Sequence, residues 1–236
     1  MKLVVATHNE GKLAEIRRIL EERLGADAAR VELLSAGSLD LPDPVEDGVT
    51  FQENALLKAR DVARRTGLPA IADDSGLIVD VMGGAPGILS ARWAGAHGDD
   101  AANNALLLAQ IEDIPDARRT ARFRCAAALV VPQVPAVSDG TAGESAFADV
   151  ADPDGAPYRI AEEVVETGEM PGVIIRAPRG EHGFGYDPLF VPDDQPEHAG
   201  GSALTSAEMT PAEKNAISHR GKALRALAPA VERLLR

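Results

Sequence analysis

The chain has 236 residues, 45% of them hydrophobic and 26% charged, a length and composition that fit one large or two small globular domains. The formal net charge of −13 argues against non-specific binding to a nucleic-acid backbone. No apolar run approaches about 18 residues, and the apolar part of the start is too short for a signal peptide, so we expect no membrane association. Cys125 is the only cysteine, which excludes an internal disulfide and favours a reducing, cytoplasmic location.

The first half of the chain alternates predicted strands with predicted helices. Apolar residues at helical spacing predict a helix over 12–24, and Thr50 and Glu53 form the pattern of a capping box that starts a helix ending near Arg65. Short apolar runs predict strands at 3–6, 31–34, 70–72 and 77–81. The last two flank the tetrapeptide Asp73-Asp74-Ser75-Gly76.

The second half continues in the same way. Helices are predicted from Asp99 or Asp100 to Ile111, after a capping box at 210–213, and over 222–235 with an interruption at Pro229. Strands are predicted at 120–131, 159–165, 173–176 and after a loop at 183–188. Residues 132–157 hold five acids and no Lys or Arg, so we expect a mobile loop there. The whole indicates one α/β domain over 1–236, with two lobes around a cleft.

The first predicted strand-to-helix turn is polar throughout, from Thr7 to Lys12. Such a turn presents free N–H groups and the positive end of the helix dipole, which suits a phosphate, and Lys12 adds a full charge. The alternative is an ordinary helix cap made by Asn9, with Lys12 in solvent. The stretch lacks the pattern of the Gly-x-x-x-x-Gly-Lys-Ser/Thr phosphate loop.

Lysine is scarce in this chain, since only five of the 24 basic residues are lysine. A position that keeps lysine can therefore require a compact ammonium rather than a guanidinium. Asn54 and Lys58 are four residues apart and share one face of a predicted helix, beside an apolar stripe. They can support a phosphate site, or they can be the solvated edge of the helix.

Two adjacent acids, Asp73 and Asp74, lie among apolar residues at the expected mouth of the sheet. Neighbouring residues of a strand point to opposite faces, so only one of the two acids is expected to face a given site. That acid can hold Mg²⁺ or accept a proton from water, and Glu46 and Asp47 can complete a site for a hard metal ion. The alternative is a simple Asp-Ser-Gly turn.

The loop Gly-Phe-Gly-Tyr-Asp-Pro at 183–188 carries two of only eight aromatic residues. An exposed ring can stack on a nucleobase while Asp187 bonds its edge; alternatively, Phe184 packs inward. Lys214 and the run Ser218-His219-Arg220 form a basic cluster in or just beyond a short helix, where basic residues are otherwise simply solvated.

In combination and in this order, the stretches resemble the inosine triphosphate pyrophosphatase family over nearly the whole chain, from Lys2 to about Leu227. The motifs are Thr-x-Asn-x-x-Lys, Phe-x-Glu-Asn-Ala-x-x-Lys-Ala, Ala-Asp-Asp-Ser-Gly-Leu, Gly-Gly-x-Pro-Gly-x-x-Ser-Ala-Arg, Gly-Phe-Gly-Tyr-Asp-Pro and Ser-His-Arg. The stretches at 132–157 and 193–206 look longer than is usual in that family, and neither overlaps a motif.

The resemblance implies an elongated α/β fold with a mixed, bent sheet, two lobes around a nucleotide-binding cleft, and a homodimer. It implies hydrolysis of non-standard purine nucleotides (ITP, dITP, XTP) to the monophosphate and pyrophosphate. By similarity, Glu46 and Asp74 would hold Mg²⁺, and Asp74 would also accept the proton of the attacking water. The phosphates would contact Thr7, His8, Asn9, Glu10, Gly11 and Lys12, supported by Asn54 and Lys58. The sugar and base would contact Ser75, Phe184, Gly185, Tyr186, Asp187, Lys214, His219 and Arg220.

Two other functions compete with this one. A Maf-like pyrophosphatase would act on pyrimidine nucleotides, but its motifs differ from Gly-Phe-Gly-Tyr-Asp-Pro and Ser-His-Arg. A regulatory module would bind a nucleotide without turnover, but such a module has no need of a base beside a metal, whereas this chain holds Glu46, Asp74 and Lys12.

Overall fold

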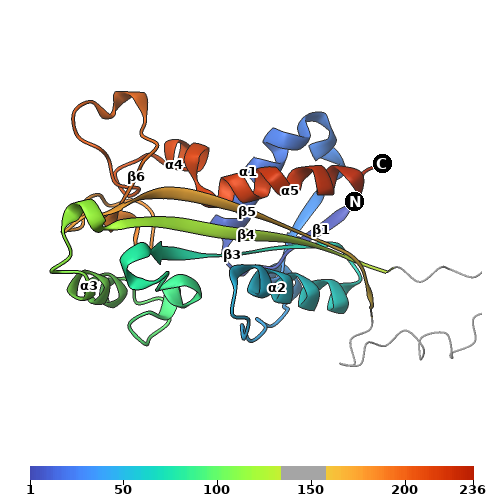
Figure 1. Cartoon of the computed structure of the whole chain (residues 1–236). Coiled ribbons are helices and arrows are strands. Elements are labelled where there is room, and N and C mark those ends of the chain that lie inside the picture. Colours follow the sequence, from blue (N-terminus) through green and yellow to red (C-terminus); the bar gives the residue numbers. More distant parts are fainter. Residues whose placement is uncertain (134–157) are drawn as a thin grey trace, which may run out of the picture. The chain divides into compact units, whose positions relative to one another are not determined.

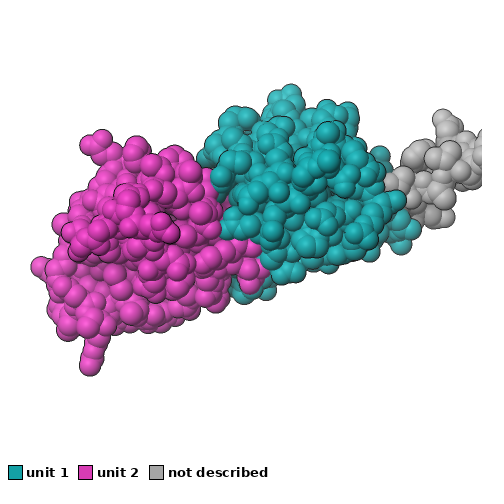
Figure 2. Space-filling view, turned by 90° about the horizontal axis from the view of Figure 1, so that it is seen from above, with its two compact units in different colours: residues 1–73, 126–166, 224–236 teal, residues 74–125, 167–223 magenta. Residues whose placement is uncertain are grey.

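A computed structural model of the chain describes residues 1–133 and 158–236 (Figure 1). Contacts divide these residues into two compact units, coloured separately in Figure 2. Unit 1 holds residues 1–73, 126–166 and 224–236, and unit 2 holds residues 74–125 and 167–223. The predicted loop at 132–157 lies outside the described residues, apart from Pro132, which ends a strand, and Gln133.

One six-stranded sheet, in the order β2-β1-β3-β4-β5-β6, organises the fold. Strand β1 pairs in parallel with β2 and β3, whereas β5 and β6 are antiparallel, so the predicted mixed α/β sheet is confirmed. The strands are β1 (Lys2–Val5), β2 (Glu32–Ser35), β3 (Ala70–Val79), β4 (Thr120–Pro132), β5 (Ile160–Ile174) and β6 (Phe190–Pro192).

Within unit 1, helices cover both faces of the strands (Figure 1). Helix α1 (Glu10–Leu24) and the end of α5 (His219–Arg233) lie on one face, and α2 (Phe51–Thr66) lies on the other. The predicted apolar stripe of α2 is buried, because its residues meet the sheet at helical spacing. Both predicted caps are present: Asn9 caps α1, and Thr50 accepts the N–H of Glu53 at 3.1 Å.

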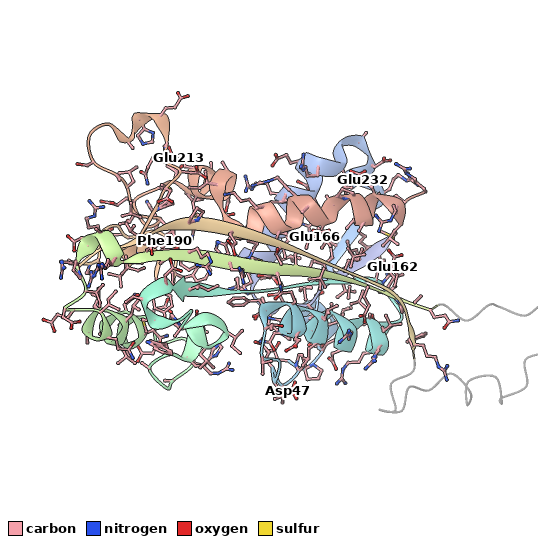
Figure 3. All side chains as sticks on the ribbon, viewed as in Figure 1. Asp47, Glu162, Glu166, Phe190, Glu213 and Glu232 are labelled. Atoms are coloured by element: carbon pink, nitrogen blue, oxygen red, sulfur yellow. The ribbon has the colours of Figure 1, made fainter. Side chains whose placement is uncertain are left out.

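Unit 2 has its own apolar core, built on β3, β4 and β5 and centred on Leu107, Phe123 and Phe190. Helix α3 (Asp100–Gln110) supplies Leu107, and the buried Arg119 side chain donates to the carbonyl of Ile111 at its end. Helix α4 (Pro211–Ile217) starts at the predicted capping box. There the hydrogen bonds from Thr210 lower the pKa of Glu213, which is labelled in Figure 3.

Short 3₁₀ turns complete the connections between these elements. They are Gly25–Arg30, Gly37–Leu39, Asp80–Met82, Gly87–Arg92, Asp116–Arg118, Asp187–Leu189 and Glu197–Ala199. No helix among the described residues is both long and apolar enough to cross a membrane.

Two predicted pairs of strands are in fact single strands. Residues 70–72 and 77–81 were expected to flank a tetrapeptide, but β3 runs through Asp73-Asp74-Ser75-Gly76, so the turn alternative is wrong. Residues 159–165 and 173–176 were expected as separate strands, but β5 runs from 160 to 174. Its glycines are not breaks: a Cβ at Gly168 would overlap the carbonyl of His219, and one at Gly172 would overlap that of Val191. They let neighbouring backbone approach closely.

The predicted interruption of the last helix is also wrong. Helix α5 begins at His219, earlier than expected, and continues through Pro229. Proline removes one helical hydrogen bond, but Leu227 and Val231 on either side of it are fully buried, and their packing holds the helix together.

We expect Gly172→Ala to lower the free energy of unfolding by about 3 kcal/mol or more, because the new methyl would meet the backbone of β6. Gly83→Ala is the matched control: Gly83 has φ +68° and open space around its Cβ position. In Gly83→Ala the only expected cost is that of holding alanine in a left-handed backbone conformation, about 1 kcal/mol. Denaturant unfolding of both variants tests this, and equal losses would contradict the close approach.

Candidate active site

The predicted site residues form two sets, one within each unit. Unit 1 holds the polar turn at 7–12 together with Glu46, Asn54, Lys58 and Asp73, and unit 2 holds Asp74, Ser75 and the predicted base-binding residues.

The polar turn at 7–12 is a tightly bonded helix cap. The Asn9 side chain accepts the N–H groups of Gly11 at 2.9 Å and Lys12 at 3.1 Å, and Thr7 Oγ1 accepts the N–H of Asn9 at 3.1 Å. The cap that the alternative predicted is therefore present, but Lys12 is not simply in solvent, because its ammonium lies 3.8 Å from Asp73 Oδ2. The expectation that the turn presents free N–H groups is wrong for Gly11 and Lys12, whose donors Asn9 already occupies, although the helix dipole and the Lys12 ammonium remain.

His8 points to a neighbouring loop. Its Nε2 lies 2.8 Å from the carbonyl oxygen of Leu41, and its Nδ1 lies 2.7 Å from Asp43 Oδ1. Because both ring nitrogens face oxygen atoms of the loop, the side chain is held there. This geometry does not support the predicted phosphate contact of the His8 ring.

Two lysines of unit 1 lie beside acids. Lys12 Nζ is 3.8 Å from Oδ2 of Asp73, a carboxylate that is almost fully buried. Lys58 Nζ is 3.2 Å from Oε1 of Glu46. The role of Asp73 as the partner of Lys12 was missed in the sequence, because two adjacent acids of a strand cannot be told apart until the faces of the strand are known.

The loop that carries Glu46 is fixed to the start of α2. The Glu53 carboxylate accepts the N–H of Val49 at 2.7 Å, so it bonds the residue before the cap rather than Thr50 itself. Asn54 is buried, and a Cβ at Gly48 would overlap its side chain, so only glycine fits there. Asn54 therefore packs against this loop, and its burial does not support a direct phosphate contact. Asp47 is exposed on the same loop (Figure 3).

Asp74 and Ser75 are the only residues of β3 that are not buried. They lie in the middle of the strand rather than at the mouth of the sheet, and a strand places them on opposite faces. Ser75 Oγ accepts a hydrogen bond from Arg220 Nη2 at 3.3 Å. Arg220 and His219 stand in the first turn of α5, where the helix dipole disfavours a cation, so their placement calls for an anionic or polar partner.

The loop at 183–188 separates its two rings. Phe184 is 60% exposed, whereas Tyr186 is buried in the core and its hydroxyl donates to the carbonyl of Ser90 at 2.9 Å. Burial, with the charge of Asp100 as a second cause, raises the pKa of Tyr186. Of the two rings, only Phe184 can stack on a base, so a stacking role for Tyr186 is excluded. Ser90 belongs to a motif noted in the sequence, but its part in holding Tyr186 was not foreseen.

The Asp187 carboxylate fixes this loop through hydrogen bonds. It is buried, and its Oδ2 accepts the N–H of Phe184 at 2.9 Å and a short hydrogen bond from Lys214 Nζ. The ammonium of Lys214 also lies 5.3 Å from the centre of the Phe184 ring. His219 stacks on Phe123 with 5.0 Å between the ring centres, so much of its ring surface is used in packing. Unit 2 therefore presents an exposed ring with an ammonium beside it.

Comparison with known sequences shows the family of the chain. The sequence model of the Ham1 family matches residues 3–230. A dITP/XTP pyrophosphatase of Bifidobacterium longum is 72% identical over the full length of both chains. One of Nocardia farcinica is 52% identical over 99% of this chain and 96% of its own.

Solved structures give the same result. A crystal structure titled nucleoside-triphosphatase / dITP/XTP pyrophosphatase, from Mycobacterium abscessus, is 46% identical with a TM-score of 0.66, covering 98% of this chain and 99% of that one. A HAM1 protein of Coxiella burnetii is 36% identical with a TM-score of 0.74, covering 99% of each chain. The chain has the mixed α/β sheet of these proteins, and it belongs to the Ham1 family.

We expect Lys214→Ala to lower the free energy of unfolding by about 3 kcal/mol at neutral pH, because it leaves the Asp187 carboxylate buried without its cation. The control is Lys222→Ala, whose partner Asp194 lies 3.6 Å away and is 60% exposed, so at most about 1 kcal/mol should be lost. Chemical denaturation compares the two variants, and a loss for Lys214→Ala as small as the control's would show that the ion pair is not needed.

Proposed function

We propose that this protein hydrolyses non-standard purine nucleoside triphosphates (ITP, dITP and XTP) to the monophosphate and pyrophosphate, as the names of its relatives indicate. The observation that carries the proposal is the 72% identity to a dITP/XTP pyrophosphatase over the full length of both chains. The side chains support it, since lysines suited to phosphates lie in unit 1 and an exposed ring with a neighbouring ammonium lies in unit 2.

In this reaction water attacks the α-phosphorus, and the β- and γ-phosphates leave together. The Asp74 carboxylate, half-buried in the middle of a strand, is proposed to accept the proton of the attacking water. Lys12 and Lys58 are proposed to bind the phosphate oxygens. Each ammonium has three N–H donors, so it can bond phosphate oxygens while it stays beside its carboxylate partner, Asp73 or Glu46.

The acids of the chain fit a magnesium ion that the substrate helps to hold. No group of three or more His, Cys, Asp or Glu side chains that could enclose a metal occurs among the described residues. Mg²⁺ usually binds one or two carboxylates and completes its shell with water and substrate phosphates, so Glu46 and Asp74 suffice. When bound, Mg²⁺ would neutralise charge on the departing pyrophosphate.

The base-binding residues favour a 6-oxo purine. Phe184 provides a stacking surface, and Lys214, whose ammonium lies over that ring at 5.3 Å from its centre, would donate to the oxygen at C6. The hydrogen bonds that Asp187 accepts from Phe184 and Lys214 both use Oδ2, so we assign the predicted acceptance of N1–H to Oδ1. Adenine would place its amino donor against the ammonium and its N1 acceptor against the carboxylate.

The first test is therefore substrate selection. With Mg²⁺ present, we expect pyrophosphate release from ITP with kcat/KM at least ~10²-fold above that for ATP, because adenine leaves buried polar groups unpaired. GTP is the informative competitor, since it shares the 6-oxo edge and differs only in its 2-amino group. Similar kcat/KM values for ITP and ATP would show that this base assignment is wrong. Binding of ITP without any pyrophosphate release would instead support the regulatory module.

The second test concerns the carboxylate on β3. Asp74→Asn should lower kcat about 10³-fold or more while the protein stays folded, because an amide neither accepts the proton nor supplies charge to the metal. Asp113→Asn is the control, an exposed acid beyond the end of α3. Circular dichroism verifies the fold, and activity within tenfold of wild type at saturating ITP would disprove the role of Asp74.

We also propose a homodimer in the cytoplasm. The dimer rests on the resemblance to the family, and the location rests on the single, buried cysteine. Light scattering should give twice the mass of one chain, and the mass of a single chain would contradict the proposal.

A further inference from the structure

Two side chains of helix α3 bond the backbone of Gly185, one at its N–H and the other at its carbonyl. The N–H of Gly185 donates to Asp100 Oδ2 at 2.6 Å, and the Asn104 side-chain nitrogen donates to the Gly185 carbonyl at 2.9 Å. The two side chains are four residues apart, which places them on one face of the helix. A half-buried loop residue is thus bound through both of its backbone groups.

Neither side chain is needed for the helix itself. The cap of α3 is Asp99, which accepts the N–H of Ala102 at 3.0 Å, so Asp100 is available for the loop. The Gly185 carbonyl can only accept, which requires the nitrogen of Asn104 to face it. The other amide atom, Asn104 Oδ1, is buried with no partner among the described residues, a cost that the bond to Gly185 offsets.

The bonds to Gly185 fix the neighbouring ring. The N–H of Phe184 is held by Asp187 and the next N–H by Asp100, so two successive peptides are bound to carboxylates. Gly185 has φ +62°, a conformation that an unrestrained loop can leave. An apolar ring gains free energy by moving out of water, so an exposed Phe184 needs a backbone that prevents this movement.

We propose that Asp100 and Asn104 are positioning residues of the base-binding loop, which hold the backbone of Gly185 so that Phe184 stays exposed beside Lys214. The inference rests on the base-binding role proposed above for Phe184. Its consequence is that these two residues set the affinity for the purine and leave the binding of the triphosphate unchanged.

The experiment compares Asp100→Ala, Asp100→Asn, Asn104→Ala and the double alanine variant. Asp113→Ala serves as the matched control, an exposed acid beyond the same helix. KM and kcat for ITP are measured together with the affinities for IMP and for inorganic tripolyphosphate in the presence of Mg²⁺. IMP reports on the base, and tripolyphosphate reports on the phosphate-binding residues.

Asp100→Ala should raise KM for ITP and Kd for IMP about tenfold, with kcat within about threefold and the affinity for tripolyphosphate unchanged. Asp100→Asn should recover most of the loss, since its amide oxygen can still accept the Gly185 N–H. The double variant should lose less than the product of the two single effects, because both side chains hold the backbone of the same residue.

Three results would overturn the inference. One is an unchanged KM and IMP affinity in Asp100→Ala. Another is an equal loss of tripolyphosphate affinity, which indicates general damage rather than positioning. The last is wild-type protein that neither hydrolyses ITP nor binds IMP, which refutes the proposed function and the inference together. The wild-type measurement thus separates the two failures.

Discussion

A carboxylate shielded from water needs a cation beside it, and this requirement organises the candidate site. The buried Asp73 and Asp187 are paired with Lys12 and Lys214, and Glu46, whose side chain is 34% exposed, is paired with Lys58. Three of the five lysines in the chain are used in this way. An ammonium is a compact charge with three donors on a flexible stem, so it can bond a carboxylate and a phosphate or carbonyl oxygen at the same time. Lysine is scarce elsewhere in the chain, which is consistent with a specific role for these three lysines.

The local signals in the sequence located most of the helices and their caps. Asn9, Thr50 and Thr210 each bond the first turn of the helix that follows, as the pattern of polar and apolar residues indicated. The predictions from the sequence were wrong where contacts with a distant segment determine the local conformation. Residues 159–165 and 173–176 were predicted as separate strands, yet one strand runs from 160 to 174, and Gly168 and Gly172 within it let the start of α5 and strand β6 approach closely. Pro229 reads as an interruption, yet the burial of its neighbours keeps the helix continuous.

In the candidate site, too, local sequence patterns did not reveal contacts between distant residues. The residue types and their order were enough to indicate a family, but not which side chains support others. Asn54 was expected at the phosphates and packs on Gly48, and His8 was expected there and is held by Leu41 and Asp43. Asp100 lies 85 positions from the Gly185 N–H that it accepts, a pairing that no local pattern encodes. Such contacts depend on the register of α3 against the loop, which is set by core packing around Leu107.

The cap made by Asn9 has a consequence for the ions that the start of α1 can attract. Its side-chain oxygen already accepts the N–H groups of Gly11 and Lys12. An incoming anion that used these donors would have to displace an intramolecular amide, so it would gain only the difference between two hydrogen-bonded states. Chloride and inorganic phosphate, abundant in any cell, would gain little from such an exchange. A polyanion that is also bound at several other points would gain enough binding free energy to displace the Asn9 side chain. The cap would therefore disfavour the binding of small inorganic anions at the start of α1.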